Sequence, residues 1–295
     1  MMIRQMLAAA MLVAGAGGAA AQEGGAAAPA EKDRPWTLSL LGGITAVQAQ
    51  ADQPFASLGL SRNFGNAWVK GEITYVGSGD ARALTIPADT WIGGLSAGTY
   101  VGNLGLEAHA LLGTRRFDAS SFRTQAGQAI NVGRSGSLFG LGGSISYDIA
   151  VADRLFITPY AGVDYNQIDF AVALTGPSGR PISSQQQSAD GVIGSAGAAI
   201  THMFANDGGS IGLNAAINTA SNIAAVAQVG AGQRTAAGTP RFVDAPKTSG
   251  SWGELGASLS FNVSKAMAID LSLIQTVSFP FGDTTAAIAG LRFRF

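Results

Sequence analysis

The chain has 295 residues, of which 47% are hydrophobic and only 13% are charged, with 41 glycines and no cysteine. Its net charge of −1 gives no overall attraction to nucleic acid, so we expect no nucleic-acid partner. The absence of cysteine excludes a disulfide framework and the acylated cysteine of a lipoprotein.

The N-terminus has the features of a secretory signal peptide. Arg4 supplies an early positive charge, residues 6–14 form an apolar core, and Ala19 to Ala21 provide small residues before Gln22. The apolar run is far shorter than the roughly 18 residues that a spanning helix requires. We therefore predict a cleaved signal peptide at residues 1–21, export in a Gram-negative cell, and a short flexible segment at residues 22–35.

Strand-like segments fill the rest of the chain. No later apolar stretch is long enough for a membrane-spanning helix, but many segments alternate apolar and polar residues over the roughly 9 to 11 residues of a tilted membrane strand. An even number of strands places both termini on one side of a membrane, and export makes that side periplasmic. Twelve segments qualify: Trp36–Val47, Phe55–Phe64, Trp68–Val76, Trp91–Val101, Leu104–Thr114, Phe139–Ile149, Leu155–Asn166, Val192–Phe204, Ser210–Ala220, Trp252–Val263, Met267–Phe279 and Thr284–Phe295.

The connections between these segments alternate in length, as in outer-membrane barrels with tight periplasmic turns and longer outer loops. Five connections are short and rich in Gly, Asn or Asp: 63–66, 102–103, 150–154, 205–209 and 264–266. The intervening connections are predicted loops at Gln48–Pro54, Gly77–Thr90, Arg115–Leu138, Gln167–Gly191, Ser221–Ser251 and Pro280–Asp283.

The last segment, TTAAIAGLRFRF, shows two faces of different chemistry. Leu291, Phe293 and Phe295 share one face, while Arg292 and Arg294 lie on the other. The first face suits lipid and the second suits a lumen. The sequence thus predicts an all-β fold, namely a transmembrane antiparallel up-and-down β-barrel of twelve strands at residues 36–295, with both termini periplasmic.

Aromatic residues gather at the predicted strand ends, as expected for two interfacial girdles. Those at predicted periplasmic ends are Trp36, Phe64, Phe204, Phe261, Phe293 and Phe295, and those at predicted outer ends are Phe55, Tyr75, Trp91, Phe139, Tyr165 and Phe279. Trp68 and Trp252 fall on the lumenal parity of their strands.

Charged residues of both signs occupy predicted lumenal positions: Lys70, Glu72, Glu107, His109, Asp164, Glu254, Asp270, Arg292 and Arg294. Mixed charge favours a hydrated ion-pair network, and a selectivity filter is the alternative. Four of them, Lys70, Glu72, Glu107 and His109, lie nearest mid-height and mark the place of a lumen constriction. Across the final hairpin, Asp270 is predicted to form a lumen ion pair with Arg292 or Arg294.

Two predicted loops could act at the cell surface. Arg115, Arg116, Arg123 and Arg134 form a basic surface loop that could contact lipopolysaccharide phosphates or an acidic partner, with ordinary solvated charge as the alternative. The loop Ser221–Ser251 is long enough to fold inward as a plug or outward as an adhesive surface.

Catalytic and metal sites lack candidates in this sequence. The chain has only two histidines, His109 and His202. Neither is followed two residues later by a serine nucleophile, the pattern of outer-membrane phospholipases, since Leu111 and Phe204 occupy those positions. Two histidines without cysteine also give no zinc site of the usual type. We therefore predict that the protein is not an enzyme and uses no cofactor and no metal.

Two stretches and the final strand carry a family resemblance: FGLGGSISYDIAVADRLFITPYAGVDYNQIDF (139–170), SWGELGASLSFNVSKAMAIDLSLIQTVSF (251–279) and TTAAIAGLRFRF. They resemble the translocator β-domain of autotransporter proteins. The resemblance implies a monomeric twelve-stranded barrel in outer-membrane lipid and lipopolysaccharide. It also implies insertion by the barrel assembly machinery, which would read Leu291, Phe293 and Phe295 as its signal.

The segment before the first strand departs from that family. Residues 22–35 are too few for an exported passenger, so we expect a structural or surface-interaction barrel without one. The alternative is a pore for passive diffusion of small polar solutes across the outer membrane.

Overall fold

The computed structural model describes residues 34–47, 52–77, 88–117, 120–125, 127–226, 233–234, 240–241, 247–280 and 283–295. The predicted signal peptide and residues 22–33 of the predicted flexible segment lie outside the described residues. In the described part, no helix is long and apolar enough to cross a membrane.

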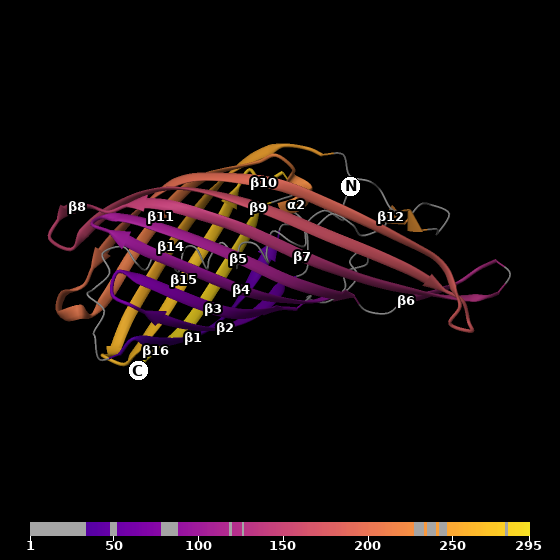
Figure 1. The fold of residues 1–295 in the computed structure, drawn as a ribbon, viewed down its shortest axis with the longest axis horizontal. Coiled ribbons are helices and arrows are strands. Elements are labelled where there is room, and N and C mark those ends of the chain that lie inside the picture. The colour runs from indigo at the N-terminus through magenta and orange to yellow at the C-terminus, as the bar shows by residue number, and fades with distance from the viewer. Residues whose placement is uncertain are drawn as a thin grey trace.

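Antiparallel strands form a closed barrel, as predicted (Figure 1). The sheet has fourteen strands, and removing the short β6 and β8 leaves the twelve that make the wall. These are β1 (Trp36–Val47), β2 (Gln53–Asn63), β3 (Ala67–Val76), β4 (Ala88–Val101), β5 (Leu104–Phe117), β7 (Ala129–Tyr147), β9 (Leu155–Thr175), β10 (Pro181–Met203), β11 (Gly209–Ala220), β14 (Gly250–Ser264), β15 (Met267–Val277) and β16 (Thr284–Arg294).

Several short elements lie outside the twelve strands of the wall. β6 (Ser120–Arg123) pairs with β7, and β8 (Ile149–Ala152) pairs with β9. A separate pair consists of β12 (Gln233–Arg234) and β13 (Pro240–Arg241). Single helical turns are η2 (Ala205–Asp207) and α2 (Ile223–Val226).

The first and last strands close the barrel against each other. β1 pairs with β16 from Thr37 opposite Arg294 to Val47 opposite Thr284. Beyond this ladder, the Trp36 N–H donates to the Phe295 carbonyl at 3.1 Å, and the Phe295 N–H donates to the Trp36 carbonyl at 3.0 Å. Closure therefore pairs the backbone groups that an open sheet would leave free at its edges.

Period-2 alternation gives the barrel an outer and an inner wall. On β15, the outward Leu271 and Leu273 are 47% and 51% exposed, whereas the inward Ile274 is 4% exposed. The same outward apolar row occurs on β14, where Leu255 and Phe261 are exposed. An apolar outer wall of this kind suits lipid, as the sequence predicted.

The two ends of the barrel differ in their connections. We call the end that holds Trp36 and Phe295 the turn end, and the opposite end the loop end. At the turn end the connections are short, such as Gly102 and Asn103 between β4 and β5 and Lys265 and Ala266 between β14 and β15. This half of the predicted alternation agrees with the structure.

Two of the predicted long loops are wrong, because strands occupy most of them. In the segment 115–138, β5 continues to Phe117 and β7 already begins at Ala129. In the segment 167–191, β9 and β10 continue to a turn at residues 176–180, where the Gly176 N–H donates to the Arg180 carbonyl at 2.9 Å. In β9 the apolar residues Ile168, Phe170 and Val172 do alternate, but they are buried on the inward parity, the reverse of a lipid-facing strand. Polar residues occupy both parities at the start of β10, so periodicity did not mark it.

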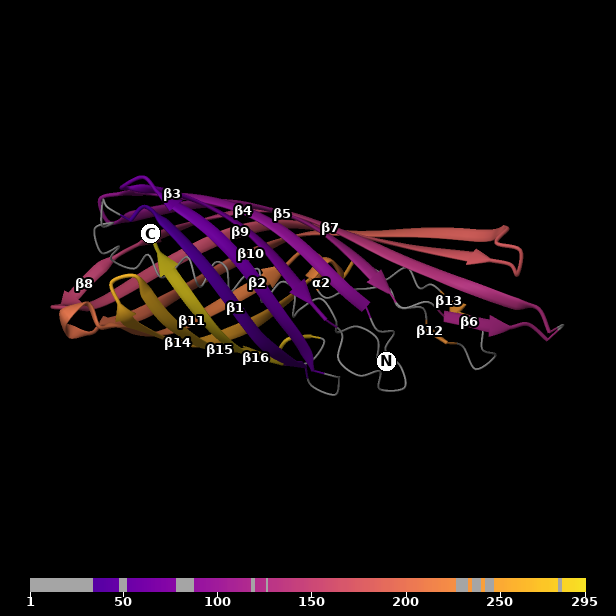
Figure 2. The same ribbon diagram turned by 90° about the horizontal axis from the view of Figure 1, so that it is seen from below.

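The extra strand length forms a sheet that extends past the loop end. β7, β9 and β10 have 19, 21 and 23 residues, against 12 in β1. Figures 1 and 2 show them reaching beyond the ends of the other barrel strands, together with β6. We call β6 and the parts of β7, β9 and β10 at residues 129–136, 170–175 and 181–190 the projecting sheet.

The outer aromatic girdle is only partly present. Tyr75 contacts Trp91 with ring centroids 5.0 Å apart, and Phe139 contacts Tyr165 at 6.3 Å. Phe55 is buried, because its parity in β2 directs it to the inner wall.

Phe279 is likewise buried rather than part of the girdle. Its strand ends at Val277, and Ser278 adopts a positive φ of 60°, which interrupts the alternation before Phe279. The assignments of Phe55 and Phe279 to the girdle were therefore wrong.

The wall assignment predicts how charges are tolerated. We expect Leu271→Arg on the outer wall to lower the free energy of unfolding in lipid vesicles by about 2 to 4 kcal/mol, because a basic side chain would face lipid near mid-membrane. Ser272→Arg, one residue along on the inner wall, should cost clearly less. Denaturant titration of the refolded protein measures both values, and equal losses would contradict the assignment.

Candidate functional site

The lumen is the candidate site, and its turn-end half is polar. Lys70 and Glu72 on β3 form an ion pair with Nζ and Oε2 2.7 Å apart. Glu107 and His109 lie on β5. The intervening strand β4, between β3 and β5, presents only Gly94, Ser96 and Gly98 opposite these charged residues. The structure thus places the four predicted constriction residues on β3 and β5, the two strands that flank β4 in the wall. Their role as a constriction stays a prediction.

His109 pairs with Asp164 on β9 and not with Glu107, which lies two residues away on its own strand. The Nε2 atom of His109 lies 2.8 Å from Oδ1 of Asp164. The pair crosses β7 at Gly142, which stands in register with both residues. A Cβ on Gly142 would lie 2.7 Å from Nε2 of His109, so this glycine leaves the space that the pair occupies.

Asp270 and Arg292 form the ion pair predicted for the last hairpin. The Arg292 Nε donates to Asp270 Oδ2 at 2.6 Å, and Nη2 donates to Oδ1 at 2.7 Å. Nη2 also donates to the Ser260 hydroxyl on β14 at 2.7 Å. Asp270 faces these groups on the inner wall, so the predicted register of the last hairpin agrees with the structure. Arg294, the other predicted partner, stands opposite Thr37 of β1.

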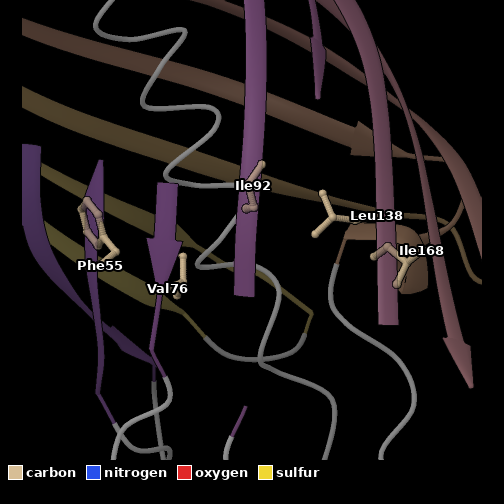
Figure 3. Packing of buried hydrophobic residues seen from close by; sticks show 5 residues of the cluster. All are labelled: Phe55, Val76, Ile92, Leu138 and Ile168. Carbon is tan, nitrogen blue, oxygen red and sulfur yellow. The ribbon is translucent and has the colours of Figure 1, made fainter. Parts of the chain in front are cut away.

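The loop-end half of the lumen carries an apolar belt that the sequence analysis missed. Five buried residues on five strands, each only 5 to 7% exposed, compose it (Figure 3): Phe55, Val76, Ile92, Leu138 and Ile168. Leu111 and Ile288 pack against them from the same wall. Leu138 and Ile168 had been assigned to loops, and extending the strand parity to them would have revealed the belt.

Register explains how the apolar belt becomes continuous. Phe55 stands opposite Val76 across β2 and β3. Farther round the wall, Gly113 of β5 separates Ile92 from Leu138, and Leu138 stands opposite Ile168. Because a Cβ on Gly113 would lie 2.7 Å from the Leu138 side chain, the glycine lets that leucine cover the gap.

The beginning of the segment Ser221–Ser251 folds against the inner wall. Ile223 of α2 is 2% exposed and packs with Ala220, Trp252, Phe279 and the half-buried Ile193. The rings of Trp252 and Phe279 meet edge to face with centroids 5.1 Å apart. The described start of this segment therefore turns inward, while residues 227–232, 235–239 and 242–246 lie outside the described residues.

The four arginines of the predicted basic loop lie on three strands, β5, β6 and β7, and differ in their exposure to solvent. Arg115 is only 4% exposed, and its guanidinium lies 4.9 Å from the centre of the Phe117 ring, so it does not belong to an exposed surface. Arg116 is exposed opposite Asp89 of β4, Arg123 is exposed on β6, and Arg134 is half-buried on β7. A contact with lipopolysaccharide stays a prediction for the exposed members.

The closing strand directs its predicted assembly residues to the outer wall. Leu291 and Phe295 are 37% and 58% exposed, and Phe293 is half-buried. Their role as an assembly signal stays a prediction. The described residues contain no group of three or more His, Cys, Asp or Glu placed to hold a metal ion.

Comparisons with known proteins agree with this architecture. The family model for the autotransporter beta-domain matches residues 12–273. The translocator domain of autotransporter NalP from Neisseria meningitidis is similar over 88% of each chain, with 14% identity and a TM-score of 0.60. The beta domain of the Bordetella autotransporter BrkA is similar over 89% of this chain and 99% of its own, with 14% identity and a TM-score of 0.58. No curated protein sequence matches the chain.

Gly142 provides a test of the pair between His109 and Asp164. We expect Gly142→Val to lower the free energy of unfolding by about 1 to 3 kcal/mol, because the added side chain would occupy the space of the pair. Gly71→Val is the matched control, since a Cβ at Gly71 meets nothing within 4 Å. Denaturant titration in vesicles compares the two variants, and equal effects would contradict this role for Gly142.

The pair between Asp270 and Arg292 is tested by a double-mutant cycle. We expect Asp270→Asn and Arg292→Gln to be non-additive by about 0.5 to 3 kcal/mol, because each change removes one charge of the same hydrogen-bonded ion pair. Unfolding free energies of the two single variants and the double variant give the coupling. Additive losses would show that the pair contributes no mutual stabilisation.

Proposed function

The chain belongs to the autotransporter beta-domain family, and we propose that it spans the outer membrane as an occluded barrel that displays the projecting sheet outside the cell. The exposed apolar outer wall supports the membrane position. The short connections at the turn end support a periplasmic location for that end, since bacterial barrels keep short turns there. Both chain termini of the barrel would then face the periplasm.

The burial of the apolar belt carries the proposal of occlusion. In a water-filled pore, side chains on the inner wall are solvated and mostly polar. Here Phe55, Val76, Ile92, Leu138 and Ile168 point inward and are nevertheless almost completely buried. This section of the lumen therefore offers apolar side chains rather than a hydrated path.

The ion pairs of the turn-end half support the same function. Lys70 with Glu72, His109 with Asp164 and Arg292 with Asp270 each join groups of opposite charge at hydrogen-bonding distance. Such pairs neutralise the inner wall locally and leave little net field to select ions. We propose that this network stabilises the barrel, and that a diffusion pore for small polar solutes is the less favoured alternative.

Membrane insertion would use the closing strand. We propose that the barrel assembly machinery reads Leu291, Phe293 and Phe295, which lie on the outer wall at the end of the chain. Surrounding lipid and lipopolysaccharide would contact that wall, and the chain would insert as a single barrel. We propose that the pair of His109 with Asp164 belongs to this structural network, and we propose no catalytic role for the lumen.

Single-channel recording in planar bilayers tests the occlusion. We expect the full-length protein to show no steady open conductance, because the apolar belt excludes a continuous water column. Replacing Phe55, Leu138 and Ile168 together with alanine should raise the conductance. Leu141→Ala is the matched control, because Leu141 is 54% exposed on the outer wall. A steady open conductance of the unmodified protein would contradict occlusion and favour the diffusion pore.

A further inference from the structure

One edge of the projecting sheet is without a strand partner among the described residues. β10 has 23 residues, from Pro181 to Met203, and β9 pairs with it along almost this whole length. The other neighbour, β11, pairs with β10 only from Ile193 onward. Residues 181–191 thus have a β-ladder on one side only.

Hydrogen bonds at both ends of the ladder between β10 and β11 show which backbone groups point to that open side. The Val192 carbonyl accepts from the Ser221 N–H at 2.9 Å, on the side of β11. At the other end, the Met203 N–H donates to Arg154 on the side of β9, and the Phe204 N–H donates to Gly209 on the side of β11. Even-numbered residues therefore present their backbone groups to the β11 side, and odd-numbered residues present theirs to β9.

Between Ile182 at the register irregularity and Asp190 at the base, the even residues of the projecting part are Ser184, Gln186 and Ser188. Register with β9 is unbroken from Ser183 to His202, so the alternation holds through them. Each has one N–H and one C=O directed away from β9, and no described residue pairs with them as a strand. We call the backbone of these three residues the open edge.

The open edge is protected at both ends and bare in the middle. Pro181 and a register irregularity lie at its outer end. Toward the barrel, the Asn222 side chain donates to the Asp190 carbonyl at 2.8 Å, and Lys247 pairs with the Asp190 carboxylate at 3.1 Å. Between these ends, the sequence Ile182 to Ala189 contains no charge and no proline, the two devices that usually prevent edge pairing.

The sequence of the open edge is self-complementary in an antiparallel arrangement. Residues 183–188 read Ser-Ser-Gln-Gln-Gln-Ser. With a two-fold axis at Gln186, this glutamine would stand opposite itself, and Ser184 would stand opposite Ser188 of a second copy. Matching uncharged polar residues then meet across the axis, which is the requirement of an isologous contact.

We propose that the open edge pairs antiparallel with the open edge of a second copy of this chain. Because β10 runs from its projecting tip into its barrel, antiparallel pairing places the two barrels at opposite ends of the joined sheet. In a single membrane the projecting sheets of two barrels extend in the same direction, so they cannot adopt this arrangement. The contact therefore joins barrels in two outer membranes that face each other. This inference rests on the proposed function, which places the projecting sheet outside the cell.

Introduced cysteines test the pairing cleanly, because the natural chain has none. Full-length Ser184→Cys and Ser188→Cys proteins are mixed in detergent micelles and oxidised mildly. We expect disulfide-linked dimers of the mixture, whereas either variant alone should not cross-link, because its thiols would be too far apart for a disulfide. Ser178→Cys, an exposed serine in the turn at the tip, is the control for random collision.

The same variants test the facing membranes. Ser184→Cys and Ser188→Cys proteins are refolded in separate vesicles of phosphatidylethanolamine and phosphatidylglycerol, which are then mixed. Cross-links between the two vesicle populations are the expected result. Cross-linking of the mixture no greater than that of Ser178→Cys would overturn the proposal, as would equal cross-linking of Ser184→Cys alone, which indicates parallel pairing.

Gln186→Pro separates the open edge from the fold of the barrel. Proline removes an N–H that points away from β9, so the β9 ladder should remain and the cross-linking should fall to the control level. Altered migration of the unheated protein on gels reports loss of the barrel, and in that case Gln186→Lys supplies the same test by placing two charges at the axis. Undiminished cross-linking in a folded variant would overturn the proposal. Conductance measures occlusion independently, so its failure is distinguishable from failure of this contact.

Discussion

The pairing of β1 with β16 is the constraint on which the rest of the structure depends. Within lipid, an unpaired backbone N–H or C=O costs several kcal/mol, so a membrane sheet must have no edge. The two reciprocal hydrogen bonds between Trp36 and Phe295 and the ladder above them remove that edge. Closure also fixes the register of all twelve strands relative to one another. Every inward or outward assignment follows from it, because a shift of one residue would reverse the two walls.

The inner wall shows how a barrel of this size accommodates its own side chains. Large lumenal groups lie over residues without side chains: the His109 and Asp164 pair crosses Gly142, and the Trp68 indole would contact a Cβ on Gly98 at 2.6 Å. Large and small residues therefore alternate around the wall as well as along each strand. The result is a lumen with charge pairs toward the turn end and the apolar belt toward the loop end. Burial of each belt side chain contributes about 1.5 to 3 kcal/mol, which favours contact within the belt over hydration.

The sequence was sufficient for the membrane part of the fold, because lipid imposes the alternation that makes strands recognisable. The bounds of β1 were predicted as observed, and the pair of Asp270 with Arg292 followed from parity across one hairpin. The partner of His109 was missed because Asp164 lies two strands away, and its height depends on the register of β7 between them. The projecting parts of β9 and β10 were missed for a different reason. In β10, polar residues such as Ser184 and Gln186 are tolerated on both faces outside lipid, so no period marks the strand. In β9, Phe170 and Val172 do alternate with their neighbours, but they lie on the inward parity rather than on the lipid-facing one.

The rule that closes the barrel also explains why an edge appears where strands leave it. Within the barrel wall, each strand has a neighbour on both sides. At the loop end β11 stops at Ala220, whereas β10 extends beyond it to Pro181 and has β9 as its one neighbour among the described strands. Water can satisfy the backbone groups exposed there, so closure is no longer required for stability. An exposed edge of this kind is either protected against pairing or available to pair with another strand. Asn222 and Lys247 block its base at Asp190, and Pro181 interrupts its tip. The uncharged residues between these two ends have no such protection. The open edge is therefore limited to a stretch that can pair with one short strand.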